Sequence, residues 1–89
     1  ADLTNADLRG AELFNANLSG ADLRYADLSS DWATGGPFGA DLSYADLTDA
    51  NLHYADLAGA DLEWILWDGT TCPDGTNSDD NGDTCENNL

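Results

Sequence analysis

The sequence predicts an all-β fold, a solenoid in which short extended segments wind into about three to four stacked, four-sided coils. Three observations predict it. Eleven five-residue blocks open with alanine and carry leucine in third place, six in succession from Ala1 and five from Ala40. Their period of five fits neither the 3.6-residue repeat of a helix nor the two-residue alternation of a strand. Alanine and leucine are also small enough to share a narrow interior in which larger pairs would collide.

Each block is expected to form one side of a coil. Its first three residues are extended and the chain turns a right angle at the last two, so that alanine and leucine point inward and four blocks complete a coil. Backbone amides then pair from coil to coil at about the 4.8 Å spacing of neighbouring strands. The central residues of the blocks are predicted to fill the core: Leu3, Leu8, Leu13, Leu18, Leu23, Leu28, Phe38, Leu42, Leu47, Leu52, Leu57 and Leu62.

The pattern A(D/N)LXX, as in ADLTN, ANLSG and ANLHY, resembles that of the pentapeptide-repeat family. The resemblance covers residues 1–67 and implies a right-handed quadrilateral β-helix. We therefore divide the chain into a solenoid, residues 1–67, and a C-terminal loop or tail, residues 68–89, whose content of Gly, Asn, Asp, Ser and Thr is typical of irregular structure. An Ala/Leu-rich helix is the alternative, but its apolar residues would recur at i, i+3, i+4 and i+7, whereas here they recur at i, i+2, i+5 and i+7.

Residues 31–39 interrupt the repeat and are one residue short of two blocks. In the interpretation we prefer, Gly36-Pro37-Phe38 replaces Ala-Asp-Leu, with Phe38 in the leucine position, and four blocks per coil are kept. The alternative is one block followed by a four-residue loop. Because an inward Asp31 would be buried without a partner, we expect a local bulge that turns Asp31 or Trp32 outward.

The preferred register also arranges the aromatic residues. It places Tyr25, Tyr44 and Trp64 above one another, in one vertical row at the fifth positions of the blocks. Such a row presents flat apolar rings with polar tips. We expect the rings to shield the edges of their own coils, with contact between subunits as the second interpretation and sugar binding as the third.

The two ends of the solenoid are expected to differ. The first block begins at Ala1 with no capping sequence before it, so we expect another molecule to cover the first coil, most simply a second copy stacked end to end. A two-fold contact would give a dimer, and a head-to-tail contact would give a filament. At the other end, Ile65 and Trp67 take the alanine and leucine positions and are expected to plug the last coil.

Both cysteines lie in the tail. Cys72 and Cys85 have no other thiol to pair with, and a disulfide between them would stabilise the tail by up to about 3 kcal/mol. Such a bond implies an oxidising compartment, so the protein is expected to be extracellular or periplasmic. An alanine in first place is compatible with removal of a signal peptide. The tail also resembles the cysteine-containing C-terminal extensions of secreted bacterial proteins.

The tail contains a partial match to a calcium-binding loop, in which alternate oxygen-bearing side chains surround the ion and a glycine permits the turn. The candidate ligands are Asn77, Asp79, Asn81 and Asp83. Asn77 stands where an aspartate is usual, and Asn88 stands where a bidentate glutamate is usual. A solvated polar tail without a metal is therefore the favoured alternative, and no other cofactor is expected.

Eighteen acidic residues against two arginines give a formal net charge of −16, which argues against nucleic acid and anionic membranes as partners. In a four-sided coil the second residue of each block points outward. One row would then contain Asp2, Asp22, Asp41 and Asp61, and another Asp7, Asp27 and Asp46. Such rows could bind cations or a basic protein, while a coat that keeps the protein soluble is the simpler interpretation.

No catalytic constellation is visible in the sequence. His53 stands alone, and an interior filled by alanine and leucine leaves no room for a substrate. We therefore predict a secreted, non-enzymatic structural module that associates with itself by stacking its coils. The alternatives are an acidic mimic of DNA that binds a type II topoisomerase, which the resemblance to the family suggests, and an extracellular protein-binding module.

Overall fold

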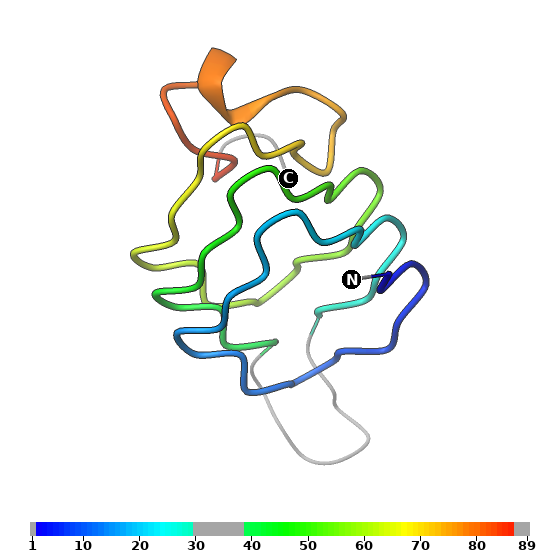
Figure 1. Ribbon diagram of the computed structural model, residues 1–89. Coiled ribbons are helices and arrows are strands. Elements are labelled where there is room, and N and C mark those ends of the chain that lie inside the picture. The colour runs from blue at the N-terminus through cyan, green and yellow to red at the C-terminus, as the bar shows by residue number, and fades with distance from the viewer. Residues whose placement is uncertain (1, 30–38, 87–89) are drawn as a thin grey trace.

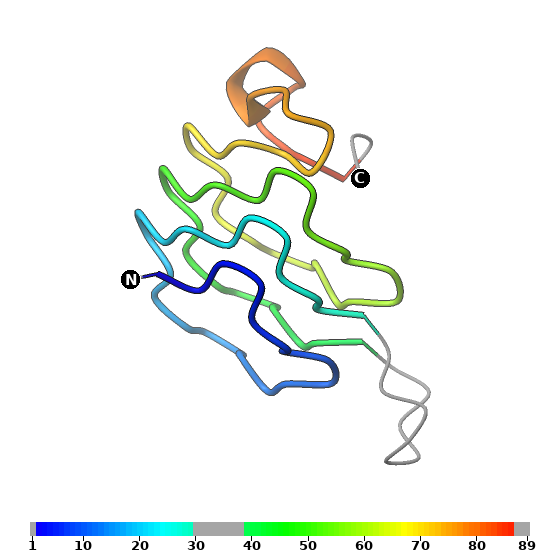
Figure 2. The ribbon, with the colours of Figure 1, turned by 90° about the vertical axis from the view of Figure 1, so that its right-hand side faces the viewer.

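The computed structural model describes residues 2–29 and 39–86 of the chain. These residues form a stack of four-sided coils, which the chain climbs from its blue N-terminal end to its orange C-terminal end (Figure 1 and Figure 2). Coil 1 comprises residues 2–20, coil 2 residues 21–29 and 39–49, and coil 3 residues 50–69. Within the described part of the chain, the one named element is the 3-10 helix η2, Ser78–Asp80, which follows coil 3.

Each side of a coil is one block, and its second residue pairs with the coils above and below. The pairs are isolated parallel bridges, such as Asp2 with Asp22. Because a turn interrupts the chain every five residues, the described sides contribute single bridges and no longer strands, so the fold is a β-solenoid without the extended strands usual in the all-β class. The second residues are Asp2, Asp22, Asn51 and Thr71 on side 1; Asp7, Asp27 and Asp56 on side 2; Glu12, Asp41 and Asp61 on side 3; and Asn17, Asp46 and Leu66 on side 4.

The corners are tight turns that the fifth residue makes possible. The alanine N–H of the next block donates to the leucine carbonyl, as from Ala6 to Leu3 at 3.1 Å. The fifth residue takes a positive φ, 60° at Asn5 and 68° at Gly10, as a type II turn requires. Glycine and asparagine adopt this conformation most readily, which explains their frequency in fifth place. Bulkier residues also adopt it here: Tyr25, Tyr44, Asp49, Tyr54 and Trp64.

The register around residues 31–39 differs from the sequence prediction. Bridge partners are 20 residues apart from Asp2 to Asp22 but 29 apart from Glu12 to Asp41, so sides 2 and 3 of coil 2 are separated by nine residues more than a regular coil requires. The Ala40 N–H donates to the carbonyl of Leu28 at 2.8 Å, the bond that elsewhere joins consecutive sides. Side 3 of coil 2 therefore begins at Ala40.

This register leaves no side of the coil for a block within residues 31–39. Both interpretations of the interruption are therefore wrong, because each gave the segment at least one block. The leucine-like position proposed for Phe38 and the outward turn proposed for Asp31 or Trp32 concern residues outside the described part of the chain.

The interior is filled by the predicted residue types. Burial is complete only in the middle of the stack, where a coil is covered from both sides. The buried alanines and leucines are Ala21, Leu23, Ala26, Leu28, Ala40, Leu42, Ala45, Leu47, Ala50, Leu52, Ala55 and Leu57. Towards the ends, Leu3, Leu8, Leu13, Leu18 and Leu62 are partly buried and pack against this core.

Residues 70–86 form a cap on coil 3. Thr71 continues the parallel pairing through Asn51, and the chain then reverses so that Thr71 also pairs antiparallel with Asn77. The pairing thus extends past residue 67, where the sequence analysis ends the solenoid. The predicted disulfide between Cys72 and Cys85 is confirmed, and both residues are fully buried.

Candidate functional site

The last side of coil 3 joins the core to the cap. Leu66 bridges Asp46, which places Ile65 and Trp67 in the alanine and leucine positions, as predicted. Trp67 is buried, and Ile65 is partly buried against the same core. Next to them the buried Thr70 hydroxyl donates to the Leu47 carbonyl at 2.7 Å, so the cap is tied to the coil below it by a satisfied buried polar group.

The outward-facing second residue of a block has a structural task. Its side-chain oxygen accepts a hydrogen bond from the backbone N–H two residues later, at 3.1 Å from Thr4 to Asp2 and at 3.0 Å from His53 to Asn51. This Asx turn is made by aspartate and asparagine alike. The sequence signal for this turn is that either aspartate or asparagine stands in second place. Both residues offer the side-chain oxygen that the turn needs, whereas only aspartate carries a charge.

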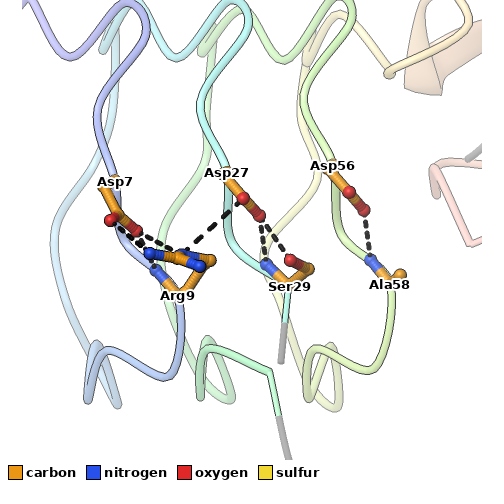
Figure 3. Close-up of polar contacts among 6 residues, drawn as sticks. All are labelled: Asp7, Arg9, Asp27, Ser29, Asp56 and Ala58. Carbon is orange, nitrogen blue, oxygen red and sulfur yellow. Dashed lines mark hydrogen bonds and ion pairs between the residues drawn. The ribbon is translucent and has the colours of Figure 1, made fainter. Parts of the chain in front are cut away.

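Side 2 shows this arrangement on three coils (Figure 3). Asp7, Asp27 and Asp56 lie in one row along the stack of coils, from left to right in the figure, and each accepts from the N–H two residues later. Arg9 Nε donates to Asp7 Oδ1 at 2.8 Å and lies 3.8 Å from Asp27 Oδ2 in the next coil. One cation thus relieves the repulsion between two stacked carboxylates.

The same hydrogen bonds favour the ionised form of the carboxyl groups. Those donated by Arg9 lower the pKa of Asp7 from 3.8 to about 2. Side-chain hydrogen bonds from the residue two places later are also the main cause that lowers the pKa values of Asp2, Asp22, Asp41 and Asp46. These five groups carry a full negative charge at neutral pH, so the outer surface of the coils is strongly acidic.

The acidic rows differ from those that the sequence predicts. Asp2 and Asp22 share side 1, but Asp41 and Asp61 lie on side 3. In the second predicted row, Asp7 and Asp27 share side 2 with Asp56, whereas Asp46 lies on side 4. Both corrections follow from the nine additional residues between sides 2 and 3 of coil 2, which shift every later block by two sides relative to the predicted register.

The aromatic residues form two groups instead of one row. Tyr44 stacks with Trp64 at a ring-centroid distance of 6.5 Å, and Phe14 meets Tyr44 edge-on at 5.6 Å. Tyr25 stacks instead on Tyr54 at 5.0 Å. The first group follows side 3 and the second follows side 1, so the two lie at opposite corners of the solenoid. The predicted row of Tyr25, Tyr44 and Trp64 is therefore wrong for Tyr25.

The sequence analysis missed three members of these groups, Phe14, His53 and Tyr54. The His53 ring stacks on Tyr54 at 3.9 Å. The signal that could have found them is the 29-residue spacing from Tyr25 to Tyr54, but that spacing can be recognised only when the nine additional residues between the coils are known.

The stacked rings contribute little net stability. A non-glycine residue at positive φ costs about 1–2 kcal/mol, and an aromatic pair returns about 0.5–1.5 kcal/mol. Tyr25 and Trp64 each stack on one ring neighbour, Tyr54 and Tyr44 respectively. Tyr25, Tyr44 and Trp64 remain more than half exposed, at 57%, 54% and 73%.

Coil 1 presents a backbone edge. In coil 2 the second residue of each side bonds to the coil below: Asp27 donates its N–H to Ala6 at 2.9 Å and accepts from Leu8 at 2.7 Å. In coil 1 the equivalent groups of Asp7 and Glu12 point away from coil 2. The fourth-residue carbonyls of coil 2 also accept from coil 1, as Arg24 does from the Asn5 N–H at 3.0 Å. The equivalent face of coil 1 therefore offers one N–H and two carbonyls per side, around the partly buried leucines of coil 1.

The candidate calcium ligands serve the cap. The Asn77 side chain accepts from the Asp79 N–H at 2.9 Å and so begins η2, and Asp79 accepts from the Gly69 N–H at 3.0 Å. The Asn81 amide donates to Thr76 Oγ1 and to the Asn77 carbonyl. These hydrogen bonds give three of the four side chains a structural role in the cap, and calcium binding by Asn77, Asp79, Asn81 and Asp83 stays a prediction.

In the described ranges, no group of three or more His, Cys, Asp or Glu side chains is placed to hold a metal ion. The same residues contain no helix with the length and apolar character needed to cross a membrane.

Comparisons with known proteins agree with the observed repeat. The sequence matches the family described as pentapeptide repeats, in 8 copies over residues 1–30 and 38–65. No curated protein matches the sequence. One similar crystal structure is HetL, a pentapeptide repeat protein involved in heterocyst differentiation regulation in the cyanobacterium Nostoc, with 34% identity and a TM-score of 0.36 over 85% of this chain and 42% of that one.

A second is a pentapeptide repeat protein of the Arabidopsis thaliana thylakoid lumen, with 33% identity and a TM-score of 0.34 over 90% of this chain and 57% of that one. The chain thus spans less than two thirds of the length of either protein. The family match covers well over half of the chain, and membership implies a right-handed quadrilateral β-helix. This chain belongs to the pentapeptide-repeat family.

Proposed function

We propose that this chain is a non-enzymatic structural module that associates with a second copy through the face of coil 1. The observation that carries the proposal is the difference between the two ends of the solenoid. Coil 3 is followed by a cap with a buried disulfide, whereas coil 1 offers partly exposed leucines inside an edge of backbone donors and acceptors.

The apolar area on this face supports a weak association. Leu3, Leu8, Leu13 and Leu18 are partly exposed, while Leu23 and Leu47 one coil further on have no exposed surface. Completing the burial of these four partly exposed leucines is worth at most about 1 kcal/mol each, or roughly 4 kcal/mol per copy. Association costs about as much or more in lost translational and rotational freedom, so backbone hydrogen bonds must supply the rest.

A role without catalysis is supported by the interior and by the family. The core positions are filled by alanine, leucine and one tryptophan, which pack against one another and leave the chemistry-bearing residues on the outer surface. Members of the pentapeptide-repeat family are generally structural or interaction modules.

We further propose that the protein acts in an oxidising compartment, outside the cytosol. The buried bond between Cys72 and Cys85 supports this, because cytosolic thiols are kept reduced. Thiol labelling of the protein taken directly from its native source tests it: no labelling of unfolded, unreduced protein is expected, and full labelling would contradict the proposal.

Sedimentation velocity over a concentration series tests the association. The weight-average mass is expected to rise above the 9.4 kDa of one chain between about 5 µM and about 0.5 mM. Two matched variants on side 4 locate the contact: Leu18→Ala removes apolar surface from coil 1, and Leu66→Ala removes it from an exposed position on coil 3. Leu18→Ala should weaken the association and Leu66→Ala should not, with thermal unfolding as the check that both are folded. A mass of one chain at every concentration would contradict the proposal.

A second candidate function is the binding of a basic protein by the acidic surface, with mimicry of DNA towards a type II topoisomerase as its specific form. The observation that favours it is that both arginines are paired with aspartates of their own blocks, Arg24 with Asp22 at 2.7 Å, so the net charge of −16 is spread over the remaining carboxylates. A gyrase supercoiling assay decides: inhibition at tens of micromolar would support this candidate, and its absence would rule out the topoisomerase form.

A further inference from the structure

The cap contains a chemically labile dipeptide, Asn81-Gly82. Of the eight asparagines in the chain, Asn81 alone is followed by glycine. An asparagine loses ammonia when the backbone nitrogen of the next residue attacks its side-chain carbonyl carbon, and glycine permits this attack best because it has no Cβ in the way. The sequence therefore indicates one residue of the cap as a candidate for deamidation.

In the closed cap the Asn81 side chain is held away from the Gly82 nitrogen. Its amide nitrogen donates to Thr76 Oγ1 at 2.8 Å and to the Asn77 carbonyl at 2.9 Å. The attack forms a five-membered ring, so Cβ of Asn81 and the Gly82 nitrogen must lie on the same side of the Cα–C bond. In an L-residue this requires a strongly negative ψ, whereas the ψ of Asn81 is 34°. Ring closure therefore needs both hydrogen bonds to break and the backbone to turn.

The backbone at Asn81 cannot turn while the cap is closed. The carbonyl of the buried Ser78 accepts from the Asn81 N–H at 3.0 Å and from the Asp83 N–H at 2.9 Å. Shortly after Asp83 the chain is fixed again, by the buried disulfide from Cys85 to Cys72. Because the reactive conformation disturbs these contacts, it belongs to the open state of the cap.

The acid that forms cannot restore the contacts of the amide. A carboxylate at position 81 has no hydrogen to donate, so its oxygens would face two acceptors, Thr76 Oγ1 and the Asn77 carbonyl. The Thr76 hydroxyl donates its own hydrogen to Asp74 and can turn to the new carboxylate only by giving up that bond. Deamidation thus removes two hydrogen bonds from the cap and places a charge against acceptors.

We propose that Asn81 is a deamidation site that the closed cap protects, and that its conversion to an acid in the open cap weakens the cap irreversibly. The Gly82 nitrogen loses its proton to water and forms a bond to Asn81 Cγ, the bond from Cγ to the amide nitrogen breaks, and ammonia leaves. Water then adds to one carbonyl of the cyclic imide and opens the ring to aspartate or isoaspartate. Asparagine and water thus give the acid and ammonia, without oxidation or reduction. This modification goes beyond the proposed function and does not depend on the face of coil 1.

Peptide mapping by mass spectrometry, after incubation at mildly alkaline pH, tests the protection. The unaltered protein and Gly82→Asn are compared, each with the disulfide intact and reduced. Asparagine tolerates the φ of 75° at Gly82, where a Cβ would meet nothing within 4 Å, so the variant keeps the turn and adds bulk beside the attacking nitrogen. Reduction should speed the appearance of acid at position 81 at least about tenfold in the unaltered protein, because the cap opens more often. Under reduction Gly82→Asn should form this acid more slowly than the unaltered protein.

Asn81→Asp, with the disulfide intact, tests the effect of the product on the cap. The N–H groups of Cys72 and Ser78 bond within the cap, to the carbonyls of Thr76 and Thr70. They should exchange with solvent at least about tenfold faster in this variant, because two hydrogen bonds are lost. The Asp46 N–H, which bonds to the Ala16 carbonyl in the coils, is the internal control and should be unchanged.

Two results would overturn the proposed site. Acid at position 81 that forms equally fast with and without the disulfide would show that the closed cap does not protect Asn81, and its absence after reduction would show that Asn81 is not a deamidation site. Unchanged exchange at Cys72 and Ser78 in Asn81→Asp would overturn the irreversible weakening of the cap.

Discussion

Gly39 is where the chain rejoins the coil, and its replacement by alanine tests the observed register. The Gly39 N–H donates to the Gly59 carbonyl at 2.9 Å, so its backbone lies directly against coil 3. A β-carbon on Gly39 would lie 2.7 Å from Ala60 N, 2.8 Å from the Gly59 carbonyl carbon and 2.9 Å from Ala60 Cα. These neighbours are backbone atoms of another coil, which cannot rotate out of the way as a side chain can.

The cost of Gly39→Ala can be estimated from these distances. Ordinary contacts of a β-carbon begin at 3.4 Å, so the two coils must separate by about 0.5 Å or more at this point. An extra methyl group in a closely packed site costs about 1–3 kcal/mol, and weakening the bond to Gly59 adds up to about 1 kcal/mol. The free energy of unfolding should fall by about 2–3 kcal/mol, which lowers the melting temperature by about 10–20 °C in a chain of this size.

Urea and thermal unfolding of the unreduced protein, followed by circular dichroism, measure the change. Gly20→Asn is the matched control: Gly20 has a φ of 69° and nothing within 4 Å of a β-carbon, and asparagine occupies the same fifth position at Asn5 and Asn15. The control should alter the free energy of unfolding by less than about 0.5 kcal/mol. A Gly39→Ala protein as stable as the unaltered one would refute the contact with coil 3, and with it the register at Ala40.

Three further predictions concern the aromatic groups, the carboxylates and the cap. Double-mutant cycles to alanine should give coupling energies of about 0.5–1.5 kcal/mol for Tyr25 with Tyr54 and for Tyr44 with Trp64, and none beyond error for Tyr25 with Tyr44; coupling of the last pair would restore the rejected row. Because the folded-state pKa of Asp7 is lowered to about 2 from 3.8, its contribution to stability is present above pH 3.8 and is lost as the pH falls towards 2. Asp7→Asn keeps the turn oxygen but not the titration, so its melting temperature should depend less on pH in that window, and an unchanged pH profile would count against the ion pair. Joint replacement of Cys72 and Cys85 by serine should lower the free energy of unfolding by up to about 3 kcal/mol and expose the cap residues 70–86 to limited proteolysis, whereas an uncleaved cap would show that the disulfide is not needed to hold it.

The interior of this protein can be predicted from the sequence alone because the repeat shows which residues point inward. Alanine and leucine recur every five residues, and a coil that turns at the fifth residue buries both, as Leu23 and Leu47 show. The disulfide is predictable for an equally simple reason, since Cys72 and Cys85 are the two cysteines of the chain.

The register could not be predicted because nothing in residues 31–39 says whether they fill sides of the coil or leave it. The segment is close in length to two blocks, so the period favours counting it. The register is set by tertiary pairing with the neighbouring coils, such as the hydrogen bond from the Gly39 N–H to the Gly59 carbonyl. This pairing places Ala40 so that its N–H donates to the Leu28 carbonyl. Because the predicted register is wrong by two sides of the coil, it places Tyr25 in the wrong aromatic group. The prediction that the Tyr25 side chain points outward is nevertheless correct.

The acidic surface shows a different limit. The number of acidic residues in the sequence predicts a surface that keeps the protein soluble or binds a partner. The structure shows that the second-position side chains also accept the hydrogen bond of an Asx turn, as at Asp2 and Asn51, which the charge does not reveal. A residue that builds the corner of its own coil is retained for that reason whether or not anything binds to it. Evidence for a partner must therefore come from backbone groups that the fold leaves open, such as those on the face of coil 1 that points away from coil 2.

Amide hydrogen exchange by NMR, compared between dilute and concentrated protein, tests the account most directly. The N–H groups of Asp27, Asp46 and Asp56 bond to the coil below and should be protected at both concentrations. Those of Asp7, Glu12 and Asn17 occupy the equivalent places on the open edge, so they should exchange fast in dilute solution and slow down as the dimer forms. Fast exchange at Asp46 in dilute solution would contradict the stacked coils, and exchange at Glu12 that stays fast at high concentration would contradict their pairing through coil 1.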